Sequence, residues 1–266
     1  MQLEVILPNE SPAAGPDRIL ALAQQAERLG YEAVWLPDHL LPPEDYSTTY
    51  GGVYEPLITL AAIAATTSTI RLGTSVLVLP MRSPFVVAKQ VATLERLAPG
   101  RVILGIGAGW ERREFDSVGA PFHERGARTD EGIRLLCHLF TVGHGPFDSE
   151  LYGFGTGVFR PTPTAPIPIM VGGMSRPALR RAARFGDAWQ AVGVAPAEFA
   201  NKAGELRAHT ERPIEVGARI GWSVLPADPA AEIAAWEAAG ADQLAIWFGD
   251  VDGFGERMRT TAEALT

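Results

Sequence analysis

Residues 3–36 read LEVILPNESPAAGPDRILALAQQAERLGYEAVWL, and this stretch indicates how the rest of the chain is organised. Residues 3–7 form a mostly apolar, β-branched run, which predicts a buried strand. In residues 17–29 the apolar positions fall on one face of a helix, and Gly30 stands where a C-terminal cap belongs. These apolar positions are Ile19, Leu22, Ala23, Ala26 and Leu29. Residues 33–36 are again short and apolar, so the stretch predicts a strand–helix–strand unit.

The same unit recurs along the chain, and eight strand–helix repeats can be counted. The predicted strands are residues 3–7, 33–36, 71–79, 102–106, 169–171, 188–192, 216–224 and 243–248. The predicted helices are residues 17–29, 57–67, 84–97, 128–140, 177–185, 196–209, 229–239 and a last one from 253 onward. Eight repeats is the number that closes a parallel (β/α)8 barrel, the TIM barrel. A doubly wound open sheet is the alternative α/β architecture.

The length of the chain fits one large domain, because α/β barrels reach this size as single units. We therefore expect one barrel domain over residues 1–266, with one insertion after the fourth helix. This insertion is the Gly- and Pro-rich stretch 143–168, which is long for a loop in a compact domain. It either covers part of the functional site or is a surface insertion.

Composition excludes several classes of partner. The net charge is -8, which disfavours a nucleic-acid partner, since such partners select a basic face. The single cysteine, Cys137, cannot build a disulfide framework and is compatible with a reducing cytoplasm. The N-terminus shows no signal peptide, and no apolar run approaches the roughly 20 residues of a membrane span. We expect a cytoplasmic protein with a small-molecule substrate.

In a barrel of this kind, function lies where strands lead into helices at their C-terminal ends. Asp38 and His39 follow the second predicted strand, and such a pair can bind a cofactor, hold a metal or transfer a proton. The alternative interpretation is a helix cap with its partner histidine. A metal would need further His, Asp or Glu ligands at other strand ends, which offer mostly glycine and aromatic residues, so we expect none.

Glycines mark the third and fourth predicted strands. Gly73 lies inside the third strand, where it predicts a bulge, a close approach by a flat group, or a small residue inside a crowded barrel. The fourth strand leads into Gly107, Ala108 and Gly109, whose backbone can lie against a planar ring. Two carboxylates follow, Glu111 and Glu114, and either one can exchange a proton. The alternative is a solvated helix start, where acids are favoured.

The fifth predicted strand ends in an anion-binding pattern. Two glycines expose backbone amides, and Ser175 is a good N-cap for the helix that follows. The residues of this turn are Gly172, Gly173, Met174, Ser175 and Arg176. Further arginines continue along the helix at positions 180, 181 and 184. The pattern predicts a cradle for a cofactor phosphate; the alternative is an ordinary tight turn with a basic surface stripe.

Several segments in this order resemble one known family. They read AVWLPDH at residues 33–39, GTSVLVLP at 73–80, KQVATLERL at 89–97, GRVILGIGAGW at 100–110 and VGG at 171–173. As a set they resemble the bacterial luciferase-like monooxygenase superfamily, in particular its coenzyme F420-dependent branch. The resemblance extends from the first strand to about Trp189 and is specific only as a set.

The resemblance implies a barrel whose deazaflavin or flavin ring lies in the mouth. It implies that Asp38 and His39 flank the ring and that Ser75 and Val76 form a bulge under it, often with a non-proline cis peptide. It also implies that the backbone of residues 107–109 lines the ring and that Gly172 and Gly173 receive the phosphate. His39 matches a catalytic position of the sugar-phosphate dehydrogenases in this branch, and Glu111 is a second candidate.

Three functions remain open at this point. The first is hydride transfer between reduced coenzyme F420 and an organic substrate, in which His39 stabilises charge or relays a proton. The second keeps the site but uses FMN and molecular oxygen, as a monooxygenase does. The third is a non-catalytic flavin-binding barrel. If the cofactor is F420, its anionic oligoglutamate tail is expected to meet Arg176 and Arg180.

One apolar helix indicates the oligomeric state that we expect. Residues 56–65 are apolar around most turns of the helix they form, and such a helix is stabilised by burial on more than one side. Relatives in the family commonly dimerise through helices of this region. We therefore expect a homodimer.

Overall fold

The computed structural model describes residues 1–222 and 229–264. Its strands are β1 Gln2–Ile6, β2 Ala33–Leu36, β3 Arg71–Thr74, β4 Leu77–Val78, β5 Val102–Gly107, β6 Ile169–Gly172, β7 Ala188–Val192, β8 Glu215–Gly221 and β9 Gln243–Trp247. Its α-helices are α1 Pro16–Arg28, α2 Ser47–Tyr50, α3 Pro56–Thr66, α4 Pro84–Leu97, α5 Arg112–Ser117, α6 Arg125–Thr141, α7 Arg176–Phe185, α8 Pro196–Arg207, α9 Pro229–Ala238 and α10 Phe254–Glu263. Three short 3₁₀ turns are η1 Glu44–Tyr46, η2 Leu79–Met81 and η3 Phe122–Glu124.

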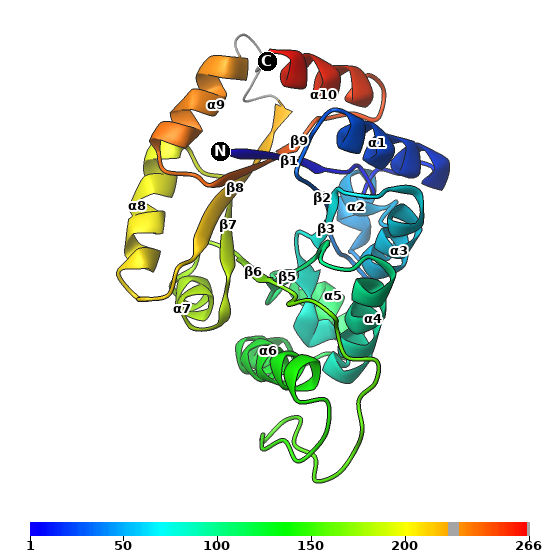
Figure 1. The fold of residues 1–266 in the computed structure, drawn as a ribbon, viewed down its shortest axis with the longest axis vertical. Coiled ribbons are helices and arrows are strands. Elements are labelled where there is room, and N and C mark those ends of the chain that lie inside the picture. The colour runs from blue at the N-terminus through cyan, green and yellow to red at the C-terminus, as the bar shows by residue number, and fades with distance from the viewer. Residues whose placement is uncertain (223–228, 265–266) are drawn as a thin grey trace.

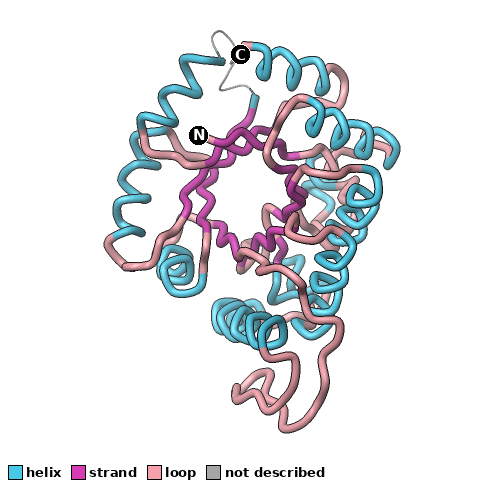
Figure 2. The backbone as a smooth tube through the Cα atoms, viewed as in Figure 1, coloured by secondary structure: helices cyan, strands magenta, loops and turns pink. Residues whose placement is uncertain are grey.

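The strands close into a parallel barrel with the helices on its outside (Figures 1 and 2). The sheet order is β3-β2-β1-β9-β8-β7-β6-β5-β4, and an additional pairing of β3 with β5 completes the ring. Because β3 and β4 both pair with β5 and together form one interrupted strand, the barrel wall has eight strand positions. The predicted (β/α)8 barrel is confirmed, and the open doubly wound sheet is excluded.

The predicted strand at residues 71–79 is interrupted. Leu72 pairs with Val102 and Leu77 pairs with Ile106, so this strand uses one residue more than β5 over the same distance. One extra residue in one of two paired strands is a β-bulge. The bulge lies at Ser75 and Val76, whose peptide bond is cis, as the family resemblance implied.

Apolar side chains fill both sides of the barrel wall. Those that point outward form the main core under the helices, and a smaller cluster fills the interior. The interior cluster comprises Ile6, Ala33, Trp35, Ile103, Met170, Ala188 and Ala245. A Cβ atom at Gly73 would lie 2.3 Å from the Trp35 ring, so this glycine leaves room for the tryptophan. Gly73 is therefore the small residue in a crowded barrel, and the bulge that was another interpretation lies two residues further on, at Ser75 and Val76.

Other differences from the predicted elements are local. Helix α2 was not predicted, α5 begins where the alternative interpretation of Glu111 and Glu114 placed a helix start, and α6 begins at Arg125 rather than at residue 128. The predicted strand 216–224 matches β8 up to Gly221, while residues 223 and 224 lie outside the described part of the chain. Among residues 1–222 and 229–264, no helix combines the length and the apolarity needed to cross a bilayer.

Candidate active site

A cavity of about 730 Å³ opens at the C-terminal ends of the strands. It brings together most of the residues that the sequence pointed to, from four separate strand ends. Those that line it are Asp38, His39, Ser75, Val76, Gly107, Ala108, Gly109, Gly172, Gly173, Met174 and Ser175. Two candidates, Glu111 and Arg176, are not among the residues that line it. The C-terminal face is where barrels of this type carry their active sites.

The bulge forms a raised support at the floor of this cavity. A Cβ atom added to Gly107 would lie 2.5 Å from a Val76 methyl group, and one added to Gly172 would lie 2.6 Å from the other. The Val76 side chain therefore fits between two stretches of bare backbone. Ser75 is held as well, because its hydroxyl donates a hydrogen bond to Gln190 Oε1 at 2.7 Å and its carbonyl accepts one from Arg219 at 2.9 Å.

Asp38 holds the chain that follows the bulge. Its buried carboxylate accepts hydrogen bonds from the Val78 backbone N–H at 2.9 Å and from Arg82 Nη2 at 2.5 Å. Arg82 also contacts Glu55 at 3.1 Å, so the guanidinium lies between two acids. Asp38 thus fixes the position of the Val76 support, in addition to lining the cavity.

His39 is oriented by a buried carboxylate. Its Nδ1 lies 2.9 Å from Oε2 of Glu114, a residue with only 3% of its surface exposed. The other oxygen of Glu114 accepts the backbone N–H groups of Leu40 and Leu41, at 2.6 and 3.0 Å. Burial raises the pKa of Glu114, but the hydrogen bonds from His39 and these amides outweigh burial and lower it. An ionised Glu114 requires Nδ1 to donate, which leaves Nε2 of His39 for exchange with a bound molecule.

Glu111 and Glu114 have different environments, although the sequence named only Glu111 as the second catalytic candidate. Glu111 is the N-cap of α5, where it accepts the Arg113 backbone N–H at 2.9 Å and pairs with the Arg113 side chain. These contacts with Arg113 lower the pKa of Glu111. The helix-start interpretation describes Glu111, and its role in proton transfer stays a prediction. Glu114 is the carboxylate that reaches His39.

The turn after β6 has the features of an anion site. The Ser175 side chain caps α7 by accepting the Ala178 backbone N–H at 3.3 Å. Arg181, one helical turn further on and buried, lines the cavity and pairs with Asp130 at 2.5 Å. Arg125 also lines the cavity. Arg176 is exposed to solvent, so Arg181 and Arg125 are the basic side chains that the fold brings to this position.

Among the lining residues that sequence reasoning missed are Glu10, Tyr50, Gln190 and Arg219. Glu10 and Arg219 form an ion pair at 3.6 Å, and burial raises the pKa of Glu10. Tyr50 stacks on His39 with ring centroids 4.3 Å apart. Gln190 and Arg219 lie inside the predicted strands 188–192 and 216–224, so the rule that selected residues after strand ends did not find them. Glu10 and Tyr50 come from segments without a recognisable pattern.

The insertion does not cover this cavity, contrary to one of the two expectations. No residue of 143–168 is among those that line it. Two bridges, His144 with Val158 and Phe147 with Phe154, give the insertion its own shape. Phe147 packs against His138 of α6, and Phe154 against Phe85 of α4. The segment lies beside α6, outside the barrel wall (Figure 1), because it connects a helix end to the N-terminal end of the next strand.

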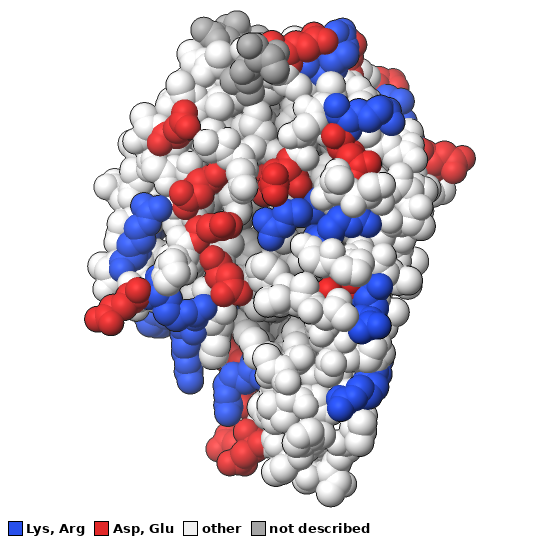
Figure 3. Space-filling view, viewed as in Figure 1, with Lys and Arg blue, Asp and Glu red and all other residues white. Residues whose placement is uncertain are grey.

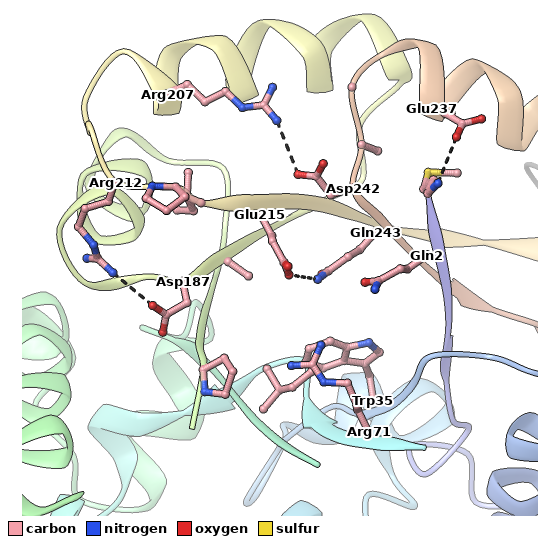
Figure 4. Close-up of a pocket in the computed structure, with 18 residues that line it drawn as sticks. Gln2, Trp35, Arg71, Asp187, Arg207, Arg212, Glu215, Glu237, Asp242 and Gln243 are labelled. Atoms are coloured by element: carbon pink, nitrogen blue, oxygen red, sulfur yellow. Dashed lines mark hydrogen bonds and ion pairs between the residues drawn. The ribbon is translucent and has the colours of Figure 1, made fainter. Parts of the chain in front are cut away.

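A larger cavity of about 1190 Å³ lies at the opposite, N-terminal end of the barrel (Figure 4). Many of its charged side chains are paired with one another. Arg212 pairs with Asp187 at 3.2 Å and Arg207 with Asp242 at 3.6 Å. Paired charges at this face of a barrel indicate stability rather than catalysis. Size alone therefore does not decide between the two cavities.

Metal ligands do not gather in the part of the chain that the structure describes. No group of three or more His, Cys, Asp or Glu side chains in residues 1–222 and 229–264 could hold a metal ion. His39 and Glu114 contact each other and backbone amides instead.

A model of the luciferase-like monooxygenase family matches residues 1–265, and the chain belongs to this family. An uncharacterized protein of Mycobacterium tuberculosis (strain ATCC 25618 / H37Rv) is 36% identical over 193 residues, covering 68% of this chain and 67% of that protein. The F420-dependent glucose-6-phosphate dehydrogenase of Kineococcus radiotolerans is 37% identical over 178 residues, covering 65% of this chain and 52% of that enzyme. The alignment thus spans about half the length of such dehydrogenases.

Solved structures agree on the fold. An F420-dependent secondary alcohol dehydrogenase in complex with an F420–acetone adduct superposes with a TM-score of 0.83 and 19% identity, over 100% of this chain and 99% of that one. The monooxygenase RslO1 from Streptomyces bottropensis superposes with a TM-score of 0.82 and 20% identity, over 100% and 98%. The relatives and the family model together identify the chain as an enzyme. The non-catalytic barrel is therefore set aside.

Proposed function

We propose that this enzyme transfers a hydride between coenzyme F420 and a small organic substrate. The observation that supports the proposal is the cavity at the strand ends, which gathers the Val76 support, the bare backbone of residues 107–109 and the anion-binding turn at residues 172–175. A planar ring with a phosphorylated tail needs these three features side by side. The F420-dependent relatives point to the same cofactor.

The residues present fit such a group. Val76 would support one face of the ring, and the glycines of residues 107–109 would allow close approach of the backbone. The amide of Ser175 at the start of α7, with Arg181, would hold the phosphate. A bound deazaflavin supplies two-electron hydride chemistry, while the protein supplies orientation and electrostatics. We assign to His39, held by Glu114, the proton that accompanies the hydride.

The competing function is an FMN-dependent monooxygenase that uses oxygen at the same site. Titration of the purified protein with F420 and with FMN, followed by fluorescence quenching, separates the two. We expect saturable binding of F420 and no oxygen consumption with reduced F420. Tighter binding of FMN, together with oxygen consumption by the reduced flavin complex, would reject the proposal in favour of the monooxygenase.

We also propose that the enzyme is a homodimer that pairs through α3. Ile58, 66% exposed, lies on the outer face of this helix with exposed Ala62 and Ala65 at helical spacing. A second copy would remove this apolar stripe from water. Light scattering at micromolar concentration should give the dimer mass, and Ile58→Arg should shift it toward the monomer. A monomer mass for the unmodified protein contradicts this proposal.

A further inference from the structure

A second cavity adjoins the candidate active site on its α7 side. It has a volume of about 620 Å³, and Arg180, Arg184 and His209 are among the residues that line it. Pro177 and Arg181 line both this cavity and the active-site cavity. The two spaces therefore meet at the first turns of α7, beside the turn that fits a phosphate. We call the second cavity, from Arg181 to Arg184, the α7 groove.

The α7 groove is basic although the protein as a whole carries a net charge of -8. Its only acidic lining residue is Asp130, and the Asp130 carboxylate already pairs with Arg181. Arg180 and Arg184 make no ion pair with a described residue, and a spacing of four places both on one face of the helix. Figure 3 shows basic side chains gathered at the edge of the molecule where α7 lies.

The basic surface of the α7 groove ends at Arg184. Beyond Arg184 the surface turns acidic, because the next hollow shares Asp130 and Arg184 with the groove but is lined by four further acids. These acids are Glu124, Glu131, Asp148 and Glu150. An anionic chain that leaves the phosphate turn is therefore attracted along α7 as far as Arg184 and repelled further on.

We propose that the α7 groove binds the oligoglutamate tail of coenzyme F420, an inference that rests on the proposed function. The tail continues from the phosphate and carries a carboxylate on each glutamate, which matches Arg180 and Arg184, the two groove arginines that have no ion-pair partner among the described residues. FMN ends at its phosphate and has nothing to place there. The groove thus distinguishes the two cofactors by charge rather than by their rings. Arg176, which the sequence suggested for the tail, lines neither cavity.

The test compares F420 that carries several glutamates with the same cofactor that carries none. Dissociation constants come from fluorescence quenching at low ionic strength, for the unmodified enzyme and for Arg180→Gln combined with Arg184→Gln. We expect the unmodified enzyme to bind the tailed form about tenfold more tightly, since each exposed ion pair contributes a few-fold. The double variant should lose this preference while its affinity for the tailless form stays unchanged. A higher salt concentration should also weaken the preference of the unmodified enzyme for the tailed form.

A matched control removes two positive charges elsewhere. Arg18 on α1 and Arg96 on α4 are exposed and line neither cavity, so Arg18→Gln with Arg96→Gln changes the net charge equally and should keep the tail preference. Equal affinity of the unmodified enzyme for both forms would overturn the groove assignment and leave the proposed function intact. Failure of both forms to bind, with binding of FMN, would reject the proposed function itself.

Discussion

Replacing His39 by alanine is expected to lower kcat by about 10²–10⁴-fold, the range found when a positioned proton-transfer group is lost. The dissociation constant for F420 should change much less, because the ring support and the phosphate turn come from other strand ends. Turnover would be followed by the absorbance of the deazaflavin, with the best acceptor from a panel of small ketones, enones and imines. Unchanged kcat in His39→Ala would remove the histidine from the mechanism.

Two further variants separate the carboxylates that follow β5. Glu114→Gln removes the charge that orients His39, and we expect a lower kcat together with a displaced pH profile of kcat. Glu111→Gln removes the negative charge of a helix cap that pairs with Arg113, and its effect on kcat should be smaller. If Glu111→Gln reduces kcat more than Glu114→Gln does, Glu111 takes the proton-transfer role that the sequence suggested for it.

Replacing Glu4 by glutamine is expected to stabilise the protein at alkaline pH. Glu4 is fully buried inside the barrel, where Oε2 accepts a hydrogen bond from Trp35 Nε1 at 2.8 Å and Oε1 has no partner. Burial raises the pKa of Glu4 to about 8, although the Trp35 hydrogen bond and the charge of Arg71 act in the opposite direction. The folded protein therefore holds this proton more tightly than the unfolded chain does.

The sign of the pH dependence follows from this difference. The contribution of Glu4 to the free energy of unfolding is greatest below pH 4.5, falls as pH rises from 4.5 to about 8, and is constant above that. The full difference corresponds to roughly 4–5 kcal/mol as an upper limit. The free energy of unfolding, measured with urea at pH 6 and at pH 9, should fall less between these two pH values in Glu4→Gln than in the unmodified protein.

An exposed carboxylate supplies the control for this comparison. Glu211→Gln removes the same charge from the surface, and it should leave the pH dependence of unfolding unchanged. The same decline between pH 6 and pH 9 in Glu4→Gln as in the unmodified protein would show that Glu4 does not hold a proton at neutral pH.

The barrel could be predicted because its signals are local. Apolar runs such as residues 102–106 and helical stripes such as that of residues 17–29 depend on neighbours in the chain, and their repetition determines closure. The glycines at 107 and 172 could also be recognised, since strand ends of a barrel share one rim. Gly73 indicated a bulge in this strand as one of three interpretations, but its position at Ser75 and Val76 was implied only by the family resemblance, because no local pattern marks which residue of a strand is the extra one.

The charged partners of the site were decided by the tertiary structure. His39 meets Glu114 across 75 residues of sequence, and Arg219 meets Ser75 across 144. The sequence favoured Glu111 as the second catalytic candidate, but Glu111 is the N-cap of α5 and pairs with Arg113, whereas Glu114 inside the same helix is buried against His39. It also pointed to Arg176, where the fold brings Arg181 to the cavity.

What the sequence by itself determined is therefore the alternation of strands and helices, the closed barrel and the rim on which function lies. Only the three-dimensional structure decided which acid orients His39, which arginines line the cavities and where the insertion packs. The physical reason is that secondary structure and burial follow from the spacing of apolar residues along the chain. The ionisation and pairing of a side chain depend instead on groups that come close only after folding.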